Sequence, residues 1–320
     1  MLSTFLLVLP VFGIILAGWL ARTIGVLGPA ATSEINRFVV YLALPALLFD
    51  VVASADIEAI WQPGFIGAFG LASFAVYAGT VFLRRRVSVP LADAAVDGLA
   101  AGYANTAYIG LPLLLAVFGD AGLAPTLIAS ILTICLIFAV AIIVIEVGLQ
   151  HGDHPGAIAR TVIMRVMRNP IVLAPLFGAF FPLSGFSMPT PLARSVELLA
   201  NAAAPSALVA LGLFLASSRI DARGMVADNA RHTRPGVVAQ LVALKLIVQP
   251  ALTWLLATQV FRLSPFLTNT AVLIAALPTG TGPFMLAEFY RREAKLTAQV
   301  ILVSTLLSVA TVTAFITVAL

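Results

Sequence analysis

Two stretches of the chain decide its fold: Ala104-Asn105-Thr106-Ala107-Tyr108-Ile109-Gly110-Leu111-Pro112 and Ala276-Leu277-Pro278-Thr279-Gly280-Thr281-Gly282-Pro283. Each stands in the middle of an apolar segment that is otherwise typical of a membrane-spanning helix. Proline lacks an amide hydrogen and clashes with the carbonyl one turn back, so each stretch is expected to interrupt its helix. Bare backbone groups are costly in hydrocarbon, so such a stretch has to face protein or a wet cavity. We therefore predict two interrupted helices whose weak points face inward; simple proline kinks with packing glycines are the alternative.

The composition around these stretches is that of a membrane protein. Of 320 residues, 61% are hydrophobic and only 10% are charged, with a mean hydropathy of +1.07, whereas a soluble chain carries about 25% charged residues. A spanning helix needs about 20 apolar residues. Hydropathy predicts ten spans, at residues 4–21, 35–52, 64–83, 94–117, 124–147, 169–183, 196–217, 237–260, 267–290 and 297–320. The single cysteine, Cys135, excludes an intramolecular disulfide and a cysteine-based metal cluster.

The basic residues predict how these spans are oriented. If the N-terminus lies outside, Arg194 and Arg262 are on the outer side, Lys245 is inside a span, and all others of the 18 Lys and Arg residues are on the inner side. This distribution is typical of the positive-inside rule. We predict a multi-pass protein of the cell (inner) membrane with both termini outside. Its basic loops are expected to contact membrane lipid, and no nucleic-acid partner is expected, because the loops lack interleaved aromatic residues.

Ten spans divide into two sets of five, and an odd number per set turns the second set upside down in the membrane. The predicted units are residues 1–147 and 169–320, joined by a cytoplasmic loop at 148–168. Aligning Pro112 with Pro283 brings the two interrupted stretches into register. Interruptions at matching places in two inverted repeats are the best sequence indication of a transporter binding site.

The predicted topology gives the sign of the electric field at the interruptions. The second half of each broken helix starts near mid-membrane, at about Leu111–Leu113 in span four and about Gly282–Phe284 in span nine. Two helix N-termini would meet there, each worth roughly half a positive charge, and their free amides bind carboxylates and phosphates. The opposite, C-terminal ends would face a hydroxyl, a proton-carrying group or a coupling cation. The predicted site for a small organic anion comprises Asn105, Thr106, Tyr108, Gly110, Pro112, Pro278, Thr279, Gly280, Thr281 and Pro283.

Three groups of residues give the chain a resemblance to a known family. They are Asn36 with Tyr41 and Ala43-Leu44-Pro45-Ala46-Leu47-Leu48-Phe49, then Asn105-Thr106-Ala107-Tyr108-Ile109-Gly110-Leu111-Pro112, and Pro278-Thr279-Gly280 with Pro283 and Tyr290. They resemble the auxin efflux carrier family, which includes plant auxin exporters and bacterial malate and malonate transporters. The resemblance covers nearly the whole chain.

This resemblance implies a ten-helix, five-plus-five inverted-repeat fold related to sodium/proton antiporters and bile acid symporters. Spans four and nine would cross at the substrate site, in a bundle that moves against a scaffold of spans one, two, six and seven. The resemblance also implies a homodimer through the scaffold helices. It places Asn105, Gly110 and Pro112 in the first crossing element and Pro278 and Pro283 in the second. Ala276 departs from the pattern, because an asparagine there would mirror Asn105.

Three ionisable residues are candidates for coupling or charge sensing. Lys245 lies well inside span eight. It is either a functional residue, as a counter-ion for the anion or a proton-linked switch, or a residue that packs beside an inner aqueous vestibule. Glu288 and Asp50 lie nearer the ends of their spans, where a solvated residue is the simpler interpretation. His151 and His154 stand close together in the inner loop, but two histidines without an assured third ligand do not predict a metal site.

The sequence contains no catalytic signature. Zinc-protease, Walker and nucleophile-elbow motifs do not occur, so we expect neither an enzyme nor an ATP-driven pump, and no cofactor besides H⁺ or Na⁺ as a coupling ion. The prediction is a secondary active transporter that moves an auxin-like or dicarboxylate anion, such as malate or malonate, by an elevator-type alternating-access mechanism. The alternatives are a passive anion channel and a cation-coupled symporter of bile-acid-like organic acids.

Overall fold

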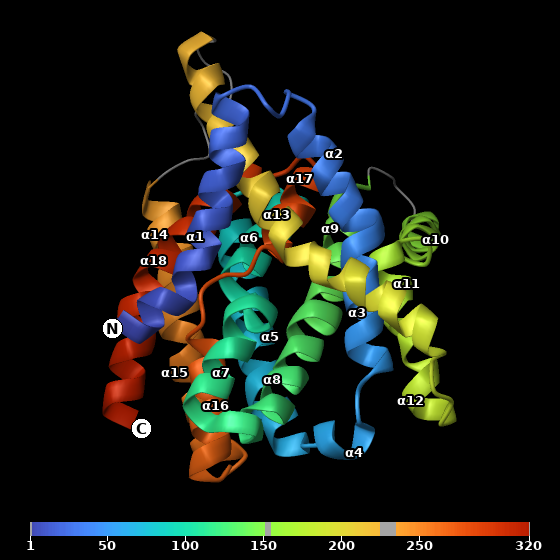
Figure 1. The fold of residues 1–320 in the computed structure, drawn as a ribbon, viewed down its shortest axis with the longest axis vertical. Helices are drawn as coiled ribbons and strands as arrows, with labels where there is room; N and C mark the ends of the chain where they lie inside the picture. The colour runs from blue at the N-terminus through green and yellow to red at the C-terminus, as the bar shows by residue number, and fades with distance from the viewer. Residues whose placement is uncertain (1, 151–154, 225–234, 320) are drawn as a thin grey trace.

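The computed structural model describes residues 2–150, 155–224 and 235–319. Every regular element in these residues is a helix of the α, π or 3-10 form, and an isolated antiparallel β-bridge joins Ala104 to Thr279. Figure 1 shows a bundle of mostly upright helices, with α10 seen end-on at one side. The predicted all-helical, multi-pass membrane class is confirmed.

The helices follow one another closely along the chain. Those before residue 150 are α1 (Leu2–Thr23), α2 (Ala31–Phe38), η1 (Val39–Ala43), α3 (Leu44–Ala53), α4 (Ile57–Ile60), α5 (Pro63–Arg86), α6 (Leu91–Gly102), η2 (Thr106–Gly110), α7 (Leu111–Phe118), η3 (Gly119–Gly122), α8 (Leu123–Ser130), η4 (Ile131–Ile137) and α9 (Phe138–Gly148). Those after it are α10 (Pro155–Val166), α11 (Pro170–Gly178), α12 (Phe180–Ser184), α13 (Thr190–Gly224), α14 (Pro235–Ala243), η5 (Leu244–Val248), α15 (Gln249–Leu255), η6 (Leu256–Val260), α16 (Pro265–Ala275), α17 (Gly282–Phe289) and α18 (Ala294–Ala319).

Six helical stretches of the described chain are long and apolar enough to cross a membrane, judged by length and composition. They are Ala31–Ala53, Pro63–Arg86, Tyr108–Gly148, Thr190–Ser217, Pro235–Val260 and Ala294–Ala319. A seventh is the pair Ala159–Val166 and Pro170–Ser184, if these helices, bent by 61°, form one span. The count is smaller than the ten predicted spans. Length alone joins the 41 residues from Tyr108 to Gly148 and leaves out the shorter apolar helices Leu9–Thr23 and Pro265–Ala275.

Small residues bring the helices around α13 close together. A Cβ on Gly212 of α13 would lie 2.1 Å from the carbonyl oxygen of Ile15, and one on Gly18 of α1 would lie 2.4 Å from that of Val209, so the two backbones touch. Gly178 of α11 approaches the backbone of Phe49 in α3 in the same way. Helices α1, α3, α11 and α13 therefore form one packed group.

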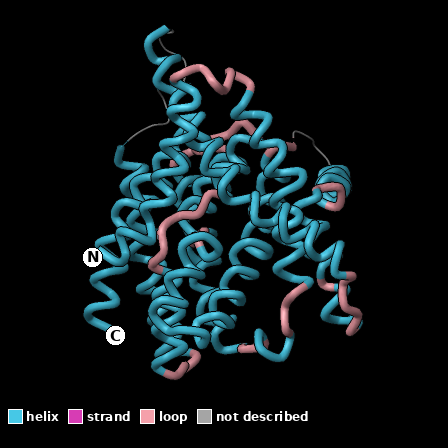
Figure 2. Tube along the Cα trace, viewed as in Figure 1, coloured by secondary structure: helices cyan, strands magenta, loops and turns pink. Residues whose placement is uncertain are grey.

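A second group of helices packs around α5 and α6. Gly98 and Gly102 of α6 face Tyr77 and Ser73 of α5, with hypothetical Cβ distances of 2.9 and 3.2 Å to their carbonyl oxygens. Helices α9, α15 and α16 also pack in this group. Figure 2 shows loop segments that run through the middle of the bundle, among the helices.

The structure corrects two local predictions. Helical structure in span four resumes at Thr106, as the π-helix η2, rather than at about Leu111–Leu113. Pro112 follows η2 without a break and lies inside the continuous helical segment 106–118, so it does not mark the interruption. The predicted loop at 148–168 contains the helix α10, in which Val162 and Val166 are buried while Ile163 and Arg160 are exposed.

Candidate functional site

The centre of the site is a pair of non-helical segments that lie side by side. Helix α6 ends at Gly102 and α16 ends at Ala275, while helical structure resumes at Thr106 and at Gly282. Between these ends the backbone amide of Asn105 donates to the carbonyl of Pro278 at 2.9 Å. The amide of Gly280 donates to the carbonyl of Tyr103 at 3.1 Å. The two segments thus satisfy each other's backbone groups, which a membrane interior requires.

Thr279 anchors this pairing from behind. It is fully buried; its hydroxyl donates to the carbonyl of Ala100 at 2.8 Å and its amide donates to the hydroxyl of Ser304 at 3.1 Å. These contacts tie the segment after α16 both to α6 and to α18. Thr279 therefore holds the crossing together and does not line the cavity described next.

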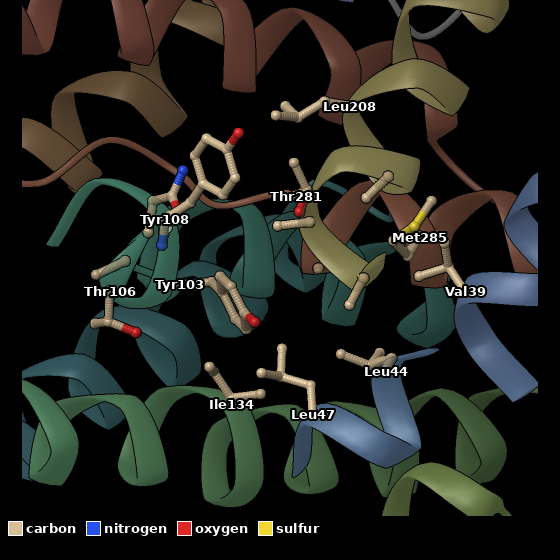
Figure 3. Close-up of a pocket in the computed structure, with 16 residues that line it drawn as sticks. Val39, Leu44, Leu47, Tyr103, Thr106, Tyr108, Ile134, Leu208, Thr281 and Met285 are labelled. Atoms are coloured by element: carbon tan, nitrogen blue, oxygen red, sulfur yellow. Dashed lines mark hydrogen bonds between the residues drawn. The ribbon is translucent and has the colours of Figure 1, made fainter. Parts of the chain in front are cut away.

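A cavity lies against the crossing. One wall comes from the crossing and its neighbours, including Tyr103, Asn105, Thr106, Tyr108, Ile134, Thr281 and Gly282. The opposite wall comes from the α13 group, through Val39, Leu44, Leu47, Ala203, Ala204, Ala207 and Leu208, while Met285 of α17 lies at the same edge as Val39 (Figure 3). The cavity therefore lies where the two helix groups meet.

The polar groups around the cavity are neutral. Asn105, Thr106, Tyr108 and Thr281 are the predicted site residues that line it. Asn105 begins the helical segment η2–α7, and its side-chain oxygen accepts from the amide of Tyr108 at 3.3 Å. The Thr106 hydroxyl has no hydrogen-bond partner among the described residues, although Thr106 is only 1% exposed.

Two helix N-termini adjoin this cavity. The segment η2–α7 starts at Thr106 and α17 starts at Gly282, with Thr281 as the preceding residue. Each N-terminus carries a partial positive charge. The amides of Thr106 and Tyr108 already donate to the Ala104 carbonyl and to the Asn105 side chain, and Pro283 has no amide hydrogen. Neutral hydroxyl and amide side chains then supply hydrogen bonds, so the arrangement suits a small anion with polar groups.

The remaining predicted binding residues shape the crossing without lining the cavity. A Cβ on Gly110 would lie 2.9 Å from the side chain of Leu277, and one on Gly280 would lie 2.8 Å from the ring of Tyr103. Pro112 and Pro283 are each the second residue of a helix, α7 and α17. These residues, together with Pro278 and Thr279, determine the backbone conformation of the crossing and do not line the cavity.

The three predicted coupling residues are not in this cavity either. Lys245 is fully buried, and its ammonium donates to the carbonyl of Ala275 at 2.7 Å. Glu288 is half-buried near the C-terminal end of α17, and Asp50 is half-buried in α3. The loop histidines His151 and His154 lie outside the described residues.

Tyr103 is the site residue that the sequence prediction missed. Its ring packs on Phe138, with centroids 5.8 Å apart, and its hydroxyl end is directed toward the cavity (Figure 3). It occupies the space that Gly280 and Gly282 leave free. Its position in the sequence could have indicated this role, because an aromatic residue stands two positions before Asn105 and the other interrupted stretch is rich in glycine.

Comparison with known proteins identifies the family of this chain. A family model described as membrane transport protein matches residues 3–316. The chain belongs to the auxin efflux carrier family of membrane transport proteins. Ala276, the position at which an asparagine would mirror Asn105, is buried outside the cavity lining.

Relatives of this auxin efflux carrier family member come from bacteria, archaea and plants. A proposed malonate transporter of Rhizobium meliloti is 32% identical over 96% of this chain and 93% of its own. An uncharacterized transporter of Methanothermobacter thermautotrophicus is 29% identical over 94% of this chain and 93% of its own. Auxin efflux carrier component 8 of Arabidopsis thaliana is 23% identical over 92% of this chain and 91% of its own. The similarity to all three extends over nearly the full fold.

Proposed function

We propose that the chain is a secondary active transporter of a small organic anion, of the dicarboxylate or auxin-like class, bound at the crossing of α6–α7 and α16–α17. The observation that carries the proposal is a largely apolar cavity that adjoins two helix N-termini and has hydroxyl and amide groups on the side of the crossing. Carboxylates are the ligands that such helix ends prefer. The name of the Rhizobium meliloti relative makes malonate the first substrate to test.

The proposed topology has ten membrane crossings in two inverted sets of five, at residues 1–147 and 169–320. The 41-residue stretch Tyr108–Gly148 would be parts of two crossings, because Gly119, with a φ of +62°, interrupts the helix there and a Cβ on Gly122 would lie 2.8 Å from the carbonyl oxygen of Leu114. Helix α1 and the pair α16–α17 would cross as well. Both termini would lie on the outer side of the cell membrane, as the basic residues predict.

The proposed mechanism is an elevator-type alternating access. The helices that pack around α5 and α6 would carry the crossing and its anion, and the group of α1, α3, α11 and α13 would be the scaffold, with a second copy of the chain bound to it. The support is that the cavity lies between the two groups and that the crossing contacts the first of them. H⁺ and Na⁺ are the coupling ions to compare.

Counterflow in proteoliposomes tests the proposal. Vesicles loaded with unlabelled malonate should accumulate labelled malonate transiently, because a carrier exchanges substrate across the membrane one molecule per cycle. Vesicles that hold a purified Asn105→Ala variant are the control. Rapid malonate flux without acceleration by internal malonate would instead identify a passive anion channel. If malonate gives neither result, the same assay with malate and an aromatic acetic acid decides the substrate class.

A further inference from the structure

Lys245 contacts the C-terminal end of a broken helix and does not line the cavity. It lies on the π-helix η5, is 0% exposed, and its ammonium donates to the carbonyl of Ala275 at 2.7 Å. Ala275 is the last residue of α16, the first half of the broken pair α16–α17. A C-terminal helix end carries roughly half a negative charge on its free carbonyls, so a protonated Lys245 side chain places a positive charge beside that end.

Gln249 donates a hydrogen bond to the end of the other broken helix. It lies four residues after Lys245, is also 0% exposed, and its side-chain amide donates to the carbonyl of Gly102 at 3.2 Å. Gly102 is the last residue of α6. The same amide donates to the hydroxyl of Ser73 at 2.9 Å, which fixes its orientation. One helix thus presents two neighbouring side chains to the carbonyl ends of both broken helices.

This arrangement changes the electrostatic balance of the crossing. Two helix N-termini at the cavity are positive and two helix C-termini behind it are negative, so without another charge the four ends cancel. The Lys245 ammonium offsets the negative ends and leaves the positive ends in excess. A buried carbonyl end otherwise needs a cation such as Na⁺, for which carbonyl oxygens are suitable ligands.

We propose that the Lys245 ammonium is the built-in cation of the crossing: with Gln249 it replaces a bound metal ion at the carbonyl ends of α6 and α16, so that the anion site forms without Na⁺. Lys245 is then a positioning residue, which acts on the anion through the field and geometry of the crossing. The part of the proposal that concerns the anion rests on the proposed function.

The first test needs no anion. The full-length chain is purified, and its Tm is measured in NaCl and in choline chloride at equal ionic strength. The wild type and the Lys295→Ala control, in which an exposed lysine is removed, should have the same Tm in both salts. Lys245→Ala should be destabilised in choline and regain about 2 °C or more in NaCl, with saturation, because Na⁺ then binds the vacated carbonyls.

Two outcomes of this test overturn the proposal. One is a saturable Na⁺ stabilisation of the wild type, which would mean that the crossing still binds a metal cation. The other is a loss of stability in Lys245→Ala that is equal in both salts, which would mean that Lys245 is only a packing residue. If Lys245→Ala is not recovered as folded protein, Lys245→Met, which keeps most of the side-chain volume but removes the donor to Ala275, takes its place in the same comparison.

The second test measures malonate binding by calorimetry in choline buffer. Lys245→Gln should bind about tenfold more weakly than the wild type, and Lys245→Arg should stay within about threefold, because charge and not shape is required. Equal affinity of all three proteins overturns the anion part of the proposal. If the wild type binds no carboxylate in either salt, the proposed function fails, and the Tm comparison still decides the role of Lys245.

Discussion

Asn105 both holds the crossing together and lines the cavity. Its amide donates to Pro278, its side-chain oxygen accepts from the amide of Tyr108, and the residue lines the cavity. We expect Asn105→Ala to reduce malonate counterflow at least about tenfold while the protein still folds, because losing a helix cap costs only about 1 kcal/mol. Asn105→Ser, which keeps a cap acceptor, should retain more activity. Size-exclusion elution and counterflow of the two variants check this expectation.

Normal counterflow in Asn105→Ala would remove the side chain from the site. If Asn105→Ala aggregates while Asn105→Ser is intact, the helix cap is required for folding. The activity of Asn105→Ser alone would then measure the role of the Asn105 side chain in binding.

We expect Glu293 to make the stability of the folded protein depend on pH. It lies in the turn between α17 and α18, outside the spanning helices. Burial, helped by the charges of Asp97 and Asp93 and opposed by those of Arg84 and Arg292, raises its pKa to about 7. Because the folded carboxyl holds its proton more tightly than the unfolded one, whose pKa is 4.5, this stabilisation is complete below the unfolded pKa. It is lost as the pH rises through about 7.

The corresponding measurement is Tm as a function of pH. Between about pH 5 and about pH 8 the wild type should lose more Tm than Glu293→Gln, which has no proton to lose. Glu58→Gln, at an exposed position, should follow the wild type. Parallel curves for all three proteins would show that Glu293 is not held in its protonated form at low pH.

At the scale of elements, the start of α17 and the ring of Tyr103 fit each other. A Cβ on Gly282 would lie 2.8 Å from both Cζ and the hydroxyl oxygen of Tyr103. Gly282→Ala should therefore displace the ring and weaken malonate binding about tenfold. Gly79→Ala, in α5, is the matched control, since nothing lies within 4 Å of a Cβ there.

A double-mutant cycle shows whether that ring is the cause. In a Tyr103→Ala background the space is already open, so adding Gly282→Ala should cause no further loss of affinity. Additive losses would mean that Gly282 acts on the helix itself and not through Tyr103.

The sequence predicted these elements better than their junctions. The start of α17 at Gly282 follows from local chemistry, because Gly282 and Pro283 suit the first turn of a helix. The interruption before Thr106 was misplaced toward Pro112, because it depends on the pairing of Asn105 with Pro278, a partner that is distant in the chain. The contact of Lys245 with Ala275 was missed for the same reason. Periodicity and composition locate helices, but they do not show which backbone end a side chain reaches.

At the scale of the whole molecule, the two broken pairs have opposite directions in the proposed topology. Helix α6 would begin on the inner side and α7 end on the outer side, whereas α16 would begin outside and α17 end inside. Figure 1 agrees with this arrangement: α6 and α17 lie in the upper part of the view and α7 and α16 in the lower part. One cavity can then adjoin both helix N-termini, because they reach mid-membrane from opposite sides.

Cysteine accessibility tests this topology directly. The chain has one cysteine, Cys135, which is replaced by serine to give a cysteine-free background. Four exposed positions then each receive a cysteine: Ser88 and Asp120, which flank α6–α7, and Ser264 and Lys295, which flank α16–α17. A membrane-impermeant maleimide applied to intact cells should label Asp120→Cys and Ser264→Cys. Ser88→Cys and Lys295→Cys should react only after permeabilisation.

The pattern separates the ten-span arrangement from a simpler one. If only the six long helices cross the membrane, α16 and α17 lie together between two spans, so Ser264→Cys and Lys295→Cys must label from the same side. That outcome would also leave α17 without a reason to meet η2–α7 at mid-membrane, and the anion site would lose one of its two positive helix ends. Labelling from opposite sides would instead show that α16–α17 crosses the membrane, which places buried Thr279 and its hydrogen bonds to Ala100 and Ser304 within the bilayer.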